Sequence, residues 1–423
     1  MKVFKFGGAS VKDAKGVRNL VEIVKDNGLQ NTLIVVSAMG KMTNAFEEVV
    51  AQYMIAPKKT PEKLLDIAAY HLEIIEQLFE PQAQIGAKEQ VSAWLEDLKI
   101  FLKRNKSPKQ SFVYDQVVSH GELLSTQIIQ QYFQEQGLKS QWIDARDCVK
   151  TDAYYRDANL DWEATKQAID TQIKKGGTYI TQGFIGSDAN NNTTTLGREG
   201  SDYTAAIFAY ALQATSVTIW KDVPGVLNAD PRIFNPTQLL LHISYREAIE
   251  LAYYGASVIH PKTIQPLQRK EIPLFVKPFN DPKQKGTVIT KGHPIVPQIP
   301  CFIVKQEQVL IELASRDFSF IIEENISEIF QLMHQYQMKV ELIQNSAISF
   351  SVCVSNKYGR LEGLVNALQA KFNVEVVVGV ALYTIRHFNQ TAIDRIKNNE
   401  KKILLEQRTQ ETIQFVVASP AVD

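Results

Sequence analysis

Short apolar runs alternate with helix-like segments along the first 280 or so residues. Residues 2–6 and 32–38 read as strands, the second fully apolar, as in a buried parallel sheet. Between them apolar positions recur at helical spacing, and Gly28 is placed to end that helix. Further strands are predicted at 141–143, 178–183, 217–220 and 273–276. This alternation predicts an α/β fold with helices on both faces of a mostly parallel sheet.

Three regions depart from this alternation. About residues 45–110 have little strand signal and are rich in Lys, Glu, Gln, Leu and Ile, which predicts a helical insertion. The stretch 281–300 is interrupted by prolines and is predicted to be a linker. Residues 301–423 contain a weak repeat, in which Arg316 and Arg386 follow strand-like runs and precede helix-like ones. Two copies indicate paired small α+β modules, the second shortened because it lacks a closing helix.

Composition and charge narrow the class of protein. The hydrophobic fraction is 45% and the charged fraction 22%, as in globular proteins. Lys and Arg balance Asp and Glu at 46 each, so nothing favours nucleic acid or an anionic membrane as partner. The longest apolar runs are strand-sized and the N-terminus has no signal core, so we expect a cytoplasmic protein. The cysteines fit neither a zinc site nor a disulfide framework; they are Cys148, Cys301 and Cys353.

Candidate chemistry first appears where the first strand ends, at Lys5-Phe6-Gly7-Gly8. A lysine supplies charge, and paired glycines let backbone N–H groups approach phosphate oxygens closely. Taken alone, the pair is as well explained by a simple turn. Neither a Walker A pattern nor G-x-G-x-x-G occurs in the chain, so a P-loop or Rossmann site is not supported.

A second candidate is the stretch TTTLGREGSDYTA, residues 193–205, at the mouth of a predicted helix. Ser201 is a good N-cap, and Asp202 in the first turn is favoured by the helix dipole. Capping does not explain Arg198 between two glycines, because a guanidinium there suits a carboxylate or phosphate. Glu122 also stands at a helix start, where a first-turn acid is the simpler reading.

The stretch IWKDVPGVLNADPR, residues 219–232, is a strand that runs into two turns. Asp222 and Arg232 are polar groups at the carboxyl edge of a parallel strand, where ligands of α/β proteins bind. Two Asp/Pro turns would explain most of this stretch without a ligand.

As a set, these motifs resemble the aspartate kinases, in that family's order and spacing. The resemblance covers essentially the whole chain and rests on KFGGAS, SAMGKMTN, SHGELLST, TQGFIGS, TTTLGREGSDYTA, IWKDVPGVLNADPR and YYGASVIHPKT. It implies an amino-acid kinase αβα sandwich over 1–280, followed by two modules that look like ACT domains. It also implies transfer of the γ-phosphoryl of MgATP to the side-chain carboxylate of L-aspartate, giving 4-phospho-L-aspartate for lysine, threonine and methionine synthesis.

The resemblance also implies roles for individual residues. Arg198 and Ser201 would hold aspartate, and Glu122 would bind its α-amino group. The pocket would be lined by Thr43 and Phe184. Lys5 would neutralise the moving phosphoryl group. Asp202 would organise Lys5 and the loop or act as a base, and the first role is favoured because the acceptor carboxylate is already ionised at neutral pH.

The remaining implied roles concern the nucleotide. Gly7 and Gly8 would donate backbone N–H groups to the phosphates. The side chains that match nucleotide-binding positions are Lys221, Asp222 and Arg232. No protein metal site is implied, because Mg²⁺ would be held mainly through phosphates.

Several positions differ from the family's pattern. Glu199 stands where many relatives have glycine, Leu227 where an aromatic residue often stacks, and Ser257 where several relatives carry a nucleotide-contacting lysine; Lys262 is a candidate replacement. In the C-terminal modules, Ala347 removes a polar contact from the Asn345-Ser346-Ala347 segment, where effector contacts usually fall. We therefore expect a homodimer joined through the ACT-like modules, with altered or weak feedback by lysine or threonine.

Two other functions compete with this interpretation. A kinase of the same fold could act on glutamate or N-acetylglutamate, although the ACT-like pair and the Glu122 motif argue against it. A non-catalytic amino-acid sensor could have kept the scaffold, but the chain retains all four of the key polar residues, Lys5, Glu122, Arg198 and Asp202.

Overall fold

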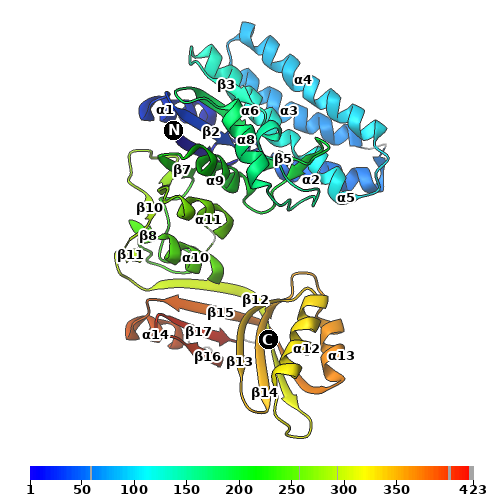
Figure 1. Ribbon diagram of the computed structural model, residues 1–423, viewed down its shortest axis with the longest axis vertical. Coiled ribbons are helices and arrows are strands. Elements are labelled where there is room, and N and C mark those ends of the chain that lie inside the picture. The colour runs from blue at the N-terminus through cyan, green and yellow to red at the C-terminus, as the bar shows by residue number, and fades with distance from the viewer. Residues whose placement is uncertain (58–59, 257, 293, 399–401, 419–423) are drawn as a thin grey trace. The chain divides into compact units, whose positions relative to one another are not determined.

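The computed structural model describes residues 1–57, 60–256, 258–292, 294–398 and 402–418 (Figure 1). They form two compact units. The first consists of Met1–Val226, Leu239–Ile249 and Val258–Val296. The second consists of Leu227–Gln238, Glu250–Ser257 and Pro297–Asp423.

A nine-stranded sheet forms the centre of the first unit, in the order β11-β8-β10-β9-β7-β1-β2-β4-β3. Its strands are β1 (Lys2–Phe6), β2 (Thr32–Val36), β3 (Gln141–Ile143), β4 (Thr178–Gln182), β7 (Ser216–Lys221), β8 (His242–Ser244), β9 (Leu274–Pro278), β10 (Thr287–Thr290) and β11 (Ile295–Val296). Pairing is parallel from β3 to β9 across the sheet, and antiparallel between β9 and β10 and between β8 and β11. The sheet is therefore mostly parallel, as predicted.

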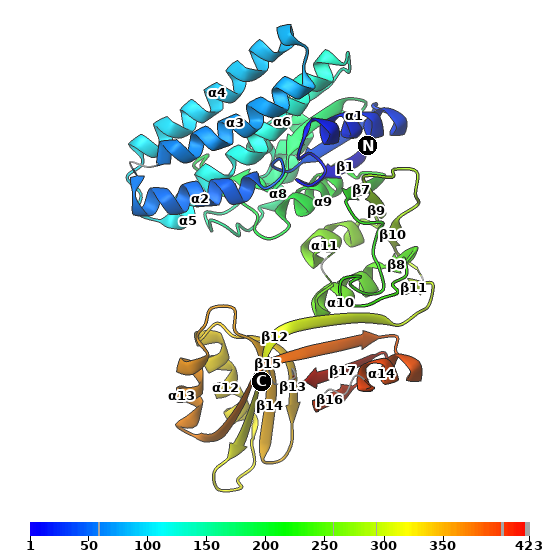
Figure 2. The ribbon, with the colours of Figure 1, turned by 180° about the vertical axis from the view of Figure 1, so that it is seen from behind.

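Helices cover both faces of this sheet, as Figures 1 and 2 show. Helix α1 (Ala14–Asn27) begins at Asp13, whose carboxylate accepts a hydrogen bond from the backbone of Gly16, and ends at Gly28 with φ 85°. It joins the core cluster that contains Phe4 and Phe6 of β1. Helix α9 (Gly200–Leu212) contacts β1, β2 and β7. Lys5 alternates with Phe4 and Phe6 along β1 and therefore points to the opposite face, where it reaches Asp202 of α9.

The other helices of the first unit flank this layer or extend from it. The region expected to be a helical insertion contains most of α2 (Met42–Ile55) and all of α3 (Thr60–Leu78) and α4 (Pro81–Arg104), and α5 (Gln110–Val118) follows it. The remaining helices are α6 (His120–Glu135), α7 (Ala145–Cys148), α8 (Trp162–Gln172), α10 (Tyr245–Tyr254), which continues into the second unit, and α11 (Pro261–Arg269). Apolar stripes on α2, α3, α4 and α6 join the same core cluster as α1. No described helix is both long and apolar enough to cross a membrane.

The stretch expected to be a linker differs from that expectation. Within 281–300 the chain forms β10 and β11, both part of the nine-stranded sheet, and enters the second unit at Pro297. The prolines are compatible with these strands because β11 is an edge strand and the prolines lie outside β10. A strand of four residues is too short to show a clear alternation in the sequence.

The second unit is built on a six-stranded antiparallel sheet, in the order β13-β14-β12-β15-β17-β16. Its strands are β12 (Cys301–Ser315), β13 (Lys339–Asn345), β14 (Ser349–Ser355), β15 (Phe372–Arg386), β16 (Ile403–Arg408) and β17 (Thr412–Val417). Its helices are α12 (Glu323–Gln335), α13 (Leu361–Gln369) and α14 (Gln390–Lys397). The expected pair of small α+β modules is thus present as two halves of one sheet.

The internal repeat explains how the two halves share strands. The long strands β12 and β15 pair along most of their length, with a register shift between Lys305 and Gln308. Beyond the shift, the end of β15 pairs with the start of β12, which supplies a further strand to the second module. Arg316 follows β12 and Arg386 ends β15, so the two repeated arginines occupy corresponding places.

Candidate active site

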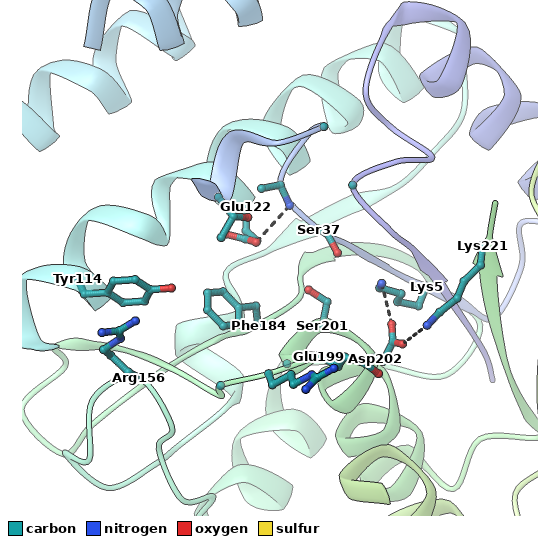
Figure 3. Close-up of a pocket in the computed structure, with 17 residues that line it drawn as sticks. Lys5, Ser37, Tyr114, Glu122, Arg156, Phe184, Glu199, Ser201, Asp202 and Lys221 are labelled. Atoms are coloured by element: carbon teal, nitrogen blue, oxygen red, sulfur yellow. Dashed lines mark hydrogen bonds and ion pairs between the residues drawn. The ribbon is translucent and has the colours of Figure 1, made fainter. Parts of the chain in front are cut away.

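An ion-pair cluster lies at the carboxyl ends of the central strands of the first unit (Figure 3). Lys5 of β1 and Lys221 of β7 stand on neighbouring parallel strands. Their Nζ atoms lie 2.7 Å and 3.1 Å from Oδ1 and Oδ2 of Asp202, in the first turn of α9. One carboxylate therefore holds two ammonium groups side by side, at the edge of the sheet where α/β proteins bind ligands.

Electrostatics keep the Asp202 carboxylate charged. Its burial acts to raise its pKa, but Lys5 and Lys221 outweigh burial and lower the pKa below its ordinary value. Both oxygens face ammonium groups, and the side chain is 3% exposed. Asp202 is therefore suited to positioning two cations and poorly suited to accepting a proton.

The Gly7-Gly8 turn follows β1 and comes close to the backbone after β2. A Cβ atom at Gly8 would lie 2.7 Å from the carbonyl oxygen of Ala38 and 2.8 Å from that of Gly40. Only glycine fits there, because neither contact involves a side chain that could move. Gly8 lines the cavity described below, and a Cβ atom at Gly7 would lie 3.4 Å from Nζ of Lys5. The two glycines thus let the backbone approach the cluster of cations.

Glu122 lies at the start of α6 and lines the same cavity. Its Oε1 accepts a hydrogen bond of 3.2 Å from the backbone of Ala38, while Oε2 has no hydrogen-bond partner in the described structure. Burial raises the pKa of Glu122 to about 8. A buried carboxyl group with one oxygen that has no partner is suited to binding a cation. Glu122 is therefore placed for more than the interaction with the helix dipole that the sequence pattern alone suggests.

The loop that carries Arg198 begins α9 differently from the prediction. The sequence predicts Ser201 as the N-cap, but α9 starts at Gly200, and Glu199 precedes it in the left-handed region with φ 54°. The tight turn at Gly197, with φ 76°, lets the helix start earlier. Ser201 is thereby placed in the first turn, lining the cavity.

The two charged side chains of this loop, Arg198 and Glu199, form no ion pair with each other in the described structure. The exposed side chain of Arg198 lines the cavity and forms no hydrogen bond or ion pair within the described residues. Glu199 does not pair with it: the Glu199 Oε2 atom is buried without a partner, and burial raises the pKa of Glu199. Arg198 is therefore free to bind an anion.

The expected nucleotide-binding residues fall into different places. Lys221 lines the cavity and donates a hydrogen bond to the carbonyl oxygen of Val258. Asp222 is exposed and does not line the cavity. Arg232 belongs to the second unit, where its guanidinium pairs with Asp230 at 2.6 Å.

The positions that differ from the family pattern can also be placed. Leu227 lies in the second unit. Lys262, the candidate replacement for a nucleotide-contacting lysine, pairs instead with Asp157 at 2.5 Å. Ser257 lies outside the described residues.

Together these groups surround a cavity of about 520 Å³. Most of the predicted catalytic, substrate-binding and nucleotide-binding residues line it, namely Lys5, Gly8, Thr43, Glu122, Phe184, Arg198, Ser201, Asp202 and Lys221. The sequence prediction missed Tyr114 and Arg156, which also line it. Neither stands beside a glycine turn or a strand end that would have signalled a site. No group of three or more His, Cys, Asp or Glu side chains in the described ranges could hold a metal ion.

Comparison with known proteins identifies the family of the chain. A model of the amino acid kinase family matches residues 1–278. The lysine-sensitive aspartokinase 3 of Escherichia coli is 32% identical over 393 residues, which cover 90% of this chain and 86% of that protein. Crystal structures of E. coli aspartokinase III, one with lysine and aspartate and one with aspartate and ADP, each superpose with a TM-score of 0.81, at 30% and 29% identity, and cover 99% of this chain and 96% of theirs. The chain therefore belongs to the aspartokinases, within the amino acid kinase family.

Proposed function

We propose that this chain is an aspartate kinase, which transfers the γ-phosphoryl group of ATP to the side-chain carboxylate of L-aspartate. The observation that carries the proposal is the arrangement of charges around one cavity. Lys5 and Lys221 are held by Asp202 at one place, the unpaired Arg198 lines the same cavity, and the Glu122 carboxyl group has one oxygen without a partner in the described structure. An acceptor with two carboxylates and one ammonium group complements this set.

Each charge of the acceptor then has a partner. Glu122 takes the α-ammonium group, and Arg198 with Ser201 takes a carboxylate. Thr43 and Phe184 line the same cavity. This arrangement places the side-chain carboxylate toward Lys5, where the phosphoryl group arrives.

The transfer itself needs little covalent help from the protein. A carboxylate oxygen of aspartate attacks the γ-phosphorus, the bond to the β,γ-bridging oxygen breaks, and ADP leaves with that electron pair. Because the acceptor is already ionised, no general base is required. Lys5 neutralises charge on the moving group, and Asp202 keeps Lys5 and Lys221 in position.

We place the phosphates of the nucleotide, with their metal ion, in the same cavity. The close backbone approach at Gly8 and the two lysines suit the phosphates of ATP. Mg²⁺ would be held mainly by those phosphates, where it would neutralise their charge, because Asp202 is engaged by two lysines. Asp222 and Arg232 remain proposed nucleotide-binding residues by resemblance.

Regulation is proposed on similar grounds. The second unit has the paired α+β modules expected to join two chains in a homodimer and to bind an amino-acid effector. The E. coli relative is described as lysine-sensitive, and one of its structures contains lysine. Ala347 follows β13, where the resemblance places effector contacts, so we propose lysine or threonine feedback that is altered or weak. A lysine inhibition curve of ordinary submillimolar midpoint would contradict the weak-feedback proposal.

Trapping of the acyl phosphate with hydroxylamine tests the function directly. The protein is incubated with MgATP, hydroxylamine and one of L-aspartate, L-glutamate or N-acetyl-L-glutamate, each with and without lysine or threonine. Hydroxamate from aspartate alone is the expected result. Hydroxamate from either of the other acids instead would indicate the related kinases, and none from any acid with ATP still bound would favour a non-catalytic sensor.

A further inference from the structure

Arg156 brings a second unpaired guanidinium to the cavity. Its side chain lines the cavity and forms no ion pair within the described residues. The guanidinium carbon lies 4.2 Å from the centre of the Tyr114 ring, within the range of a cation–π interaction. The Tyr114 hydroxyl donates a hydrogen bond of 2.7 Å to Glu47, which fixes the ring against α2. Arg156 is thus held in place while its guanidinium N–H donors, which make no hydrogen bond within the described residues, remain available to a ligand.

The backbone at Arg156 is strained, and buried groups maintain the strain. Its φ is 74°, which is unusual for a residue with a long side chain. Its N–H donates to both carboxylate oxygens of Asp115, at 3.1 Å each. Asp115 is fully buried and also accepts hydrogen bonds of 2.8 Å from the N–H and hydroxyl of Thr195 in β6 (Thr193–Thr195). Strain that is maintained beside a binding cavity is a reason to look for a function.

The same loop is fixed to the loop that carries Arg198. A Cβ atom at Gly197 would lie 2.5 Å from an Asp157 carboxylate oxygen and 3.3 Å from the Arg156 carbonyl oxygen. The two arginines therefore extend from loops in direct contact, and both line one cavity. In Figure 3, Arg156 and Tyr114 lie at one end of the cavity, and Lys5, Asp202 and Lys221 lie at the other.

From this placement we propose that Arg156 recognises the α-carboxylate of the acceptor, together with Arg198, and so determines which acids are accepted. The proposal rests on the proposed aspartate kinase activity. The reacting carboxylate must face Lys5, and the ammonium group has Glu122 as its partner. The α-carboxylate then remains, and Arg156 is an unpaired cation, among the residues that the structure describes, at the end of the cavity away from Lys5. A planar guanidinium can hold it through two parallel hydrogen bonds.

The test compares L-aspartate with its α-amide, L-isoasparagine, which lacks the α-carboxylate charge. Hydroxamate formation is measured for the unmodified protein, Arg156→Gly and Arg156→Lys. Glycine adopts φ 74° without strain, so Arg156→Gly keeps the backbone bonds to Asp115. Arg104→Ala, which removes an exposed arginine at the end of α4, is the matched control and should behave as the unmodified protein.

We expect Arg156→Gly to raise the KM for L-aspartate by about 10- to 100-fold, the scale for losing hydrogen bonds to a charged group, with a smaller change in kcat. The KM of Arg156→Lys for L-aspartate should lie between the values for the unmodified protein and for Arg156→Gly. The KM for the α-amide should be the same within about two-fold in the unmodified protein and in Arg156→Gly. Where turnover of the α-amide is slow, its inhibition constant against aspartate is compared instead.

Two results would overturn the assignment. One is an unchanged KM for L-aspartate in Arg156→Gly that melts like the unmodified protein. The other is an equal loss with aspartate and with the α-amide, because that would show a general disturbance of the cavity. If the unmodified protein forms no hydroxamate from L-aspartate, the proposed function fails first, and the Arg156 assignment fails with it.

Discussion

Replacing Glu122 with glutamine should stabilise the first unit while weakening its binding of aspartate. Glu122 is buried, and burial raises its pKa from 4.5 to about 8 in the folded chain. For an acid whose pKa is raised on folding, the contribution of that group to the free energy of unfolding is fully present below the unfolded pKa. It is lost as pH rises toward the folded pKa. Glutamine resembles the protonated acid and keeps the oxygen that accepts from Ala38. It removes the cost of ionisation.

The size of the effect follows from the two pKa values. Between pH 4.5 and pH 7 the unfolded chain loses this proton, whereas the folded chain keeps most of it. Each pH unit in that interval costs about 1.4 kcal/mol, so the ionisable side chain destabilises the fold by about 3 kcal/mol at pH 7. The stability gained by Glu122→Gln should therefore grow from pH 4.5, reach about 3 kcal/mol at pH 7 and level off above pH 8.

The free energy of unfolding of Glu122→Gln and of the unmodified protein is measured by tryptophan fluorescence during guanidinium unfolding, from pH 5 to pH 9. All four tryptophans lie in the first unit, so the signal reports that unit; they are Trp94, Trp142, Trp162 and Trp220. Glu89→Gln, at an exposed position of α4, is the control and should show no pH-dependent difference. A stability difference between Glu122→Gln and the unmodified protein that does not change with pH would refute the reasoning.

The same pKa shift makes a prediction about binding. Only about a tenth of Glu122 is ionised at pH 7 in the free protein, because its pKa is about one unit higher. If the ionised form binds the α-ammonium group, the KM for L-aspartate should fall roughly ten-fold from pH 7 to pH 9. In Glu122→Gln the KM should be higher throughout and should not follow this titration.

Three further substitutions test the ion-pair cluster and its loop. Lys5→Ala should lower kcat at least ~100-fold, the scale for losing one preorganised charge-stabilising group, and near-normal turnover in the folded variant would exclude that role. Asp202→Asn should also lower kcat, since Lys5 and Lys221 lose their shared anion; a pH–rate profile that loses only its acidic limb would instead indicate a proton-accepting role. Gly8→Ala should lower both the melting temperature and activity because of its contacts with backbone carbonyls, whereas Gly86→Ala, in an open helical position, should not.

The fold could be predicted where local sequence and tertiary environment agree. Residues 33–36 are wholly apolar and belong to β2, a strand in which every residue is buried, so their pattern and burial match. Helix α1 carries both an end signal, Gly28, and an apolar stripe that fits the core. The short strands β10 and β11 could not be predicted, because their pairing with β8 and β9 is decided by distant residues.

The sequence predicts those residues of the candidate site that are charged and stand at the ends of strands and helices. Lys5, Glu122, Arg198 and Asp202 all stand at such ends. Tyr114 sits in the middle of α5, and Arg156 lies in the loop between α7 and α8. Their place in the cavity depends on how α5 packs against β6, which no local pattern indicates.

The shape of the cavity depends largely on groups that do not line it. Phe184 and Arg156 line it with φ values of 71° and 74°, and such backbone costs roughly 1 kcal/mol or more at each position. The N–H of Phe184 donates to the Thr204 hydroxyl at 2.9 Å, and that of Arg156 donates to Asp115. Both acceptors are fully buried, so their hydrogen bonds are protected from water and can offset the strain. The strained loops are therefore preorganised before any ligand arrives, which is what a site that catalyses by positioning charge requires.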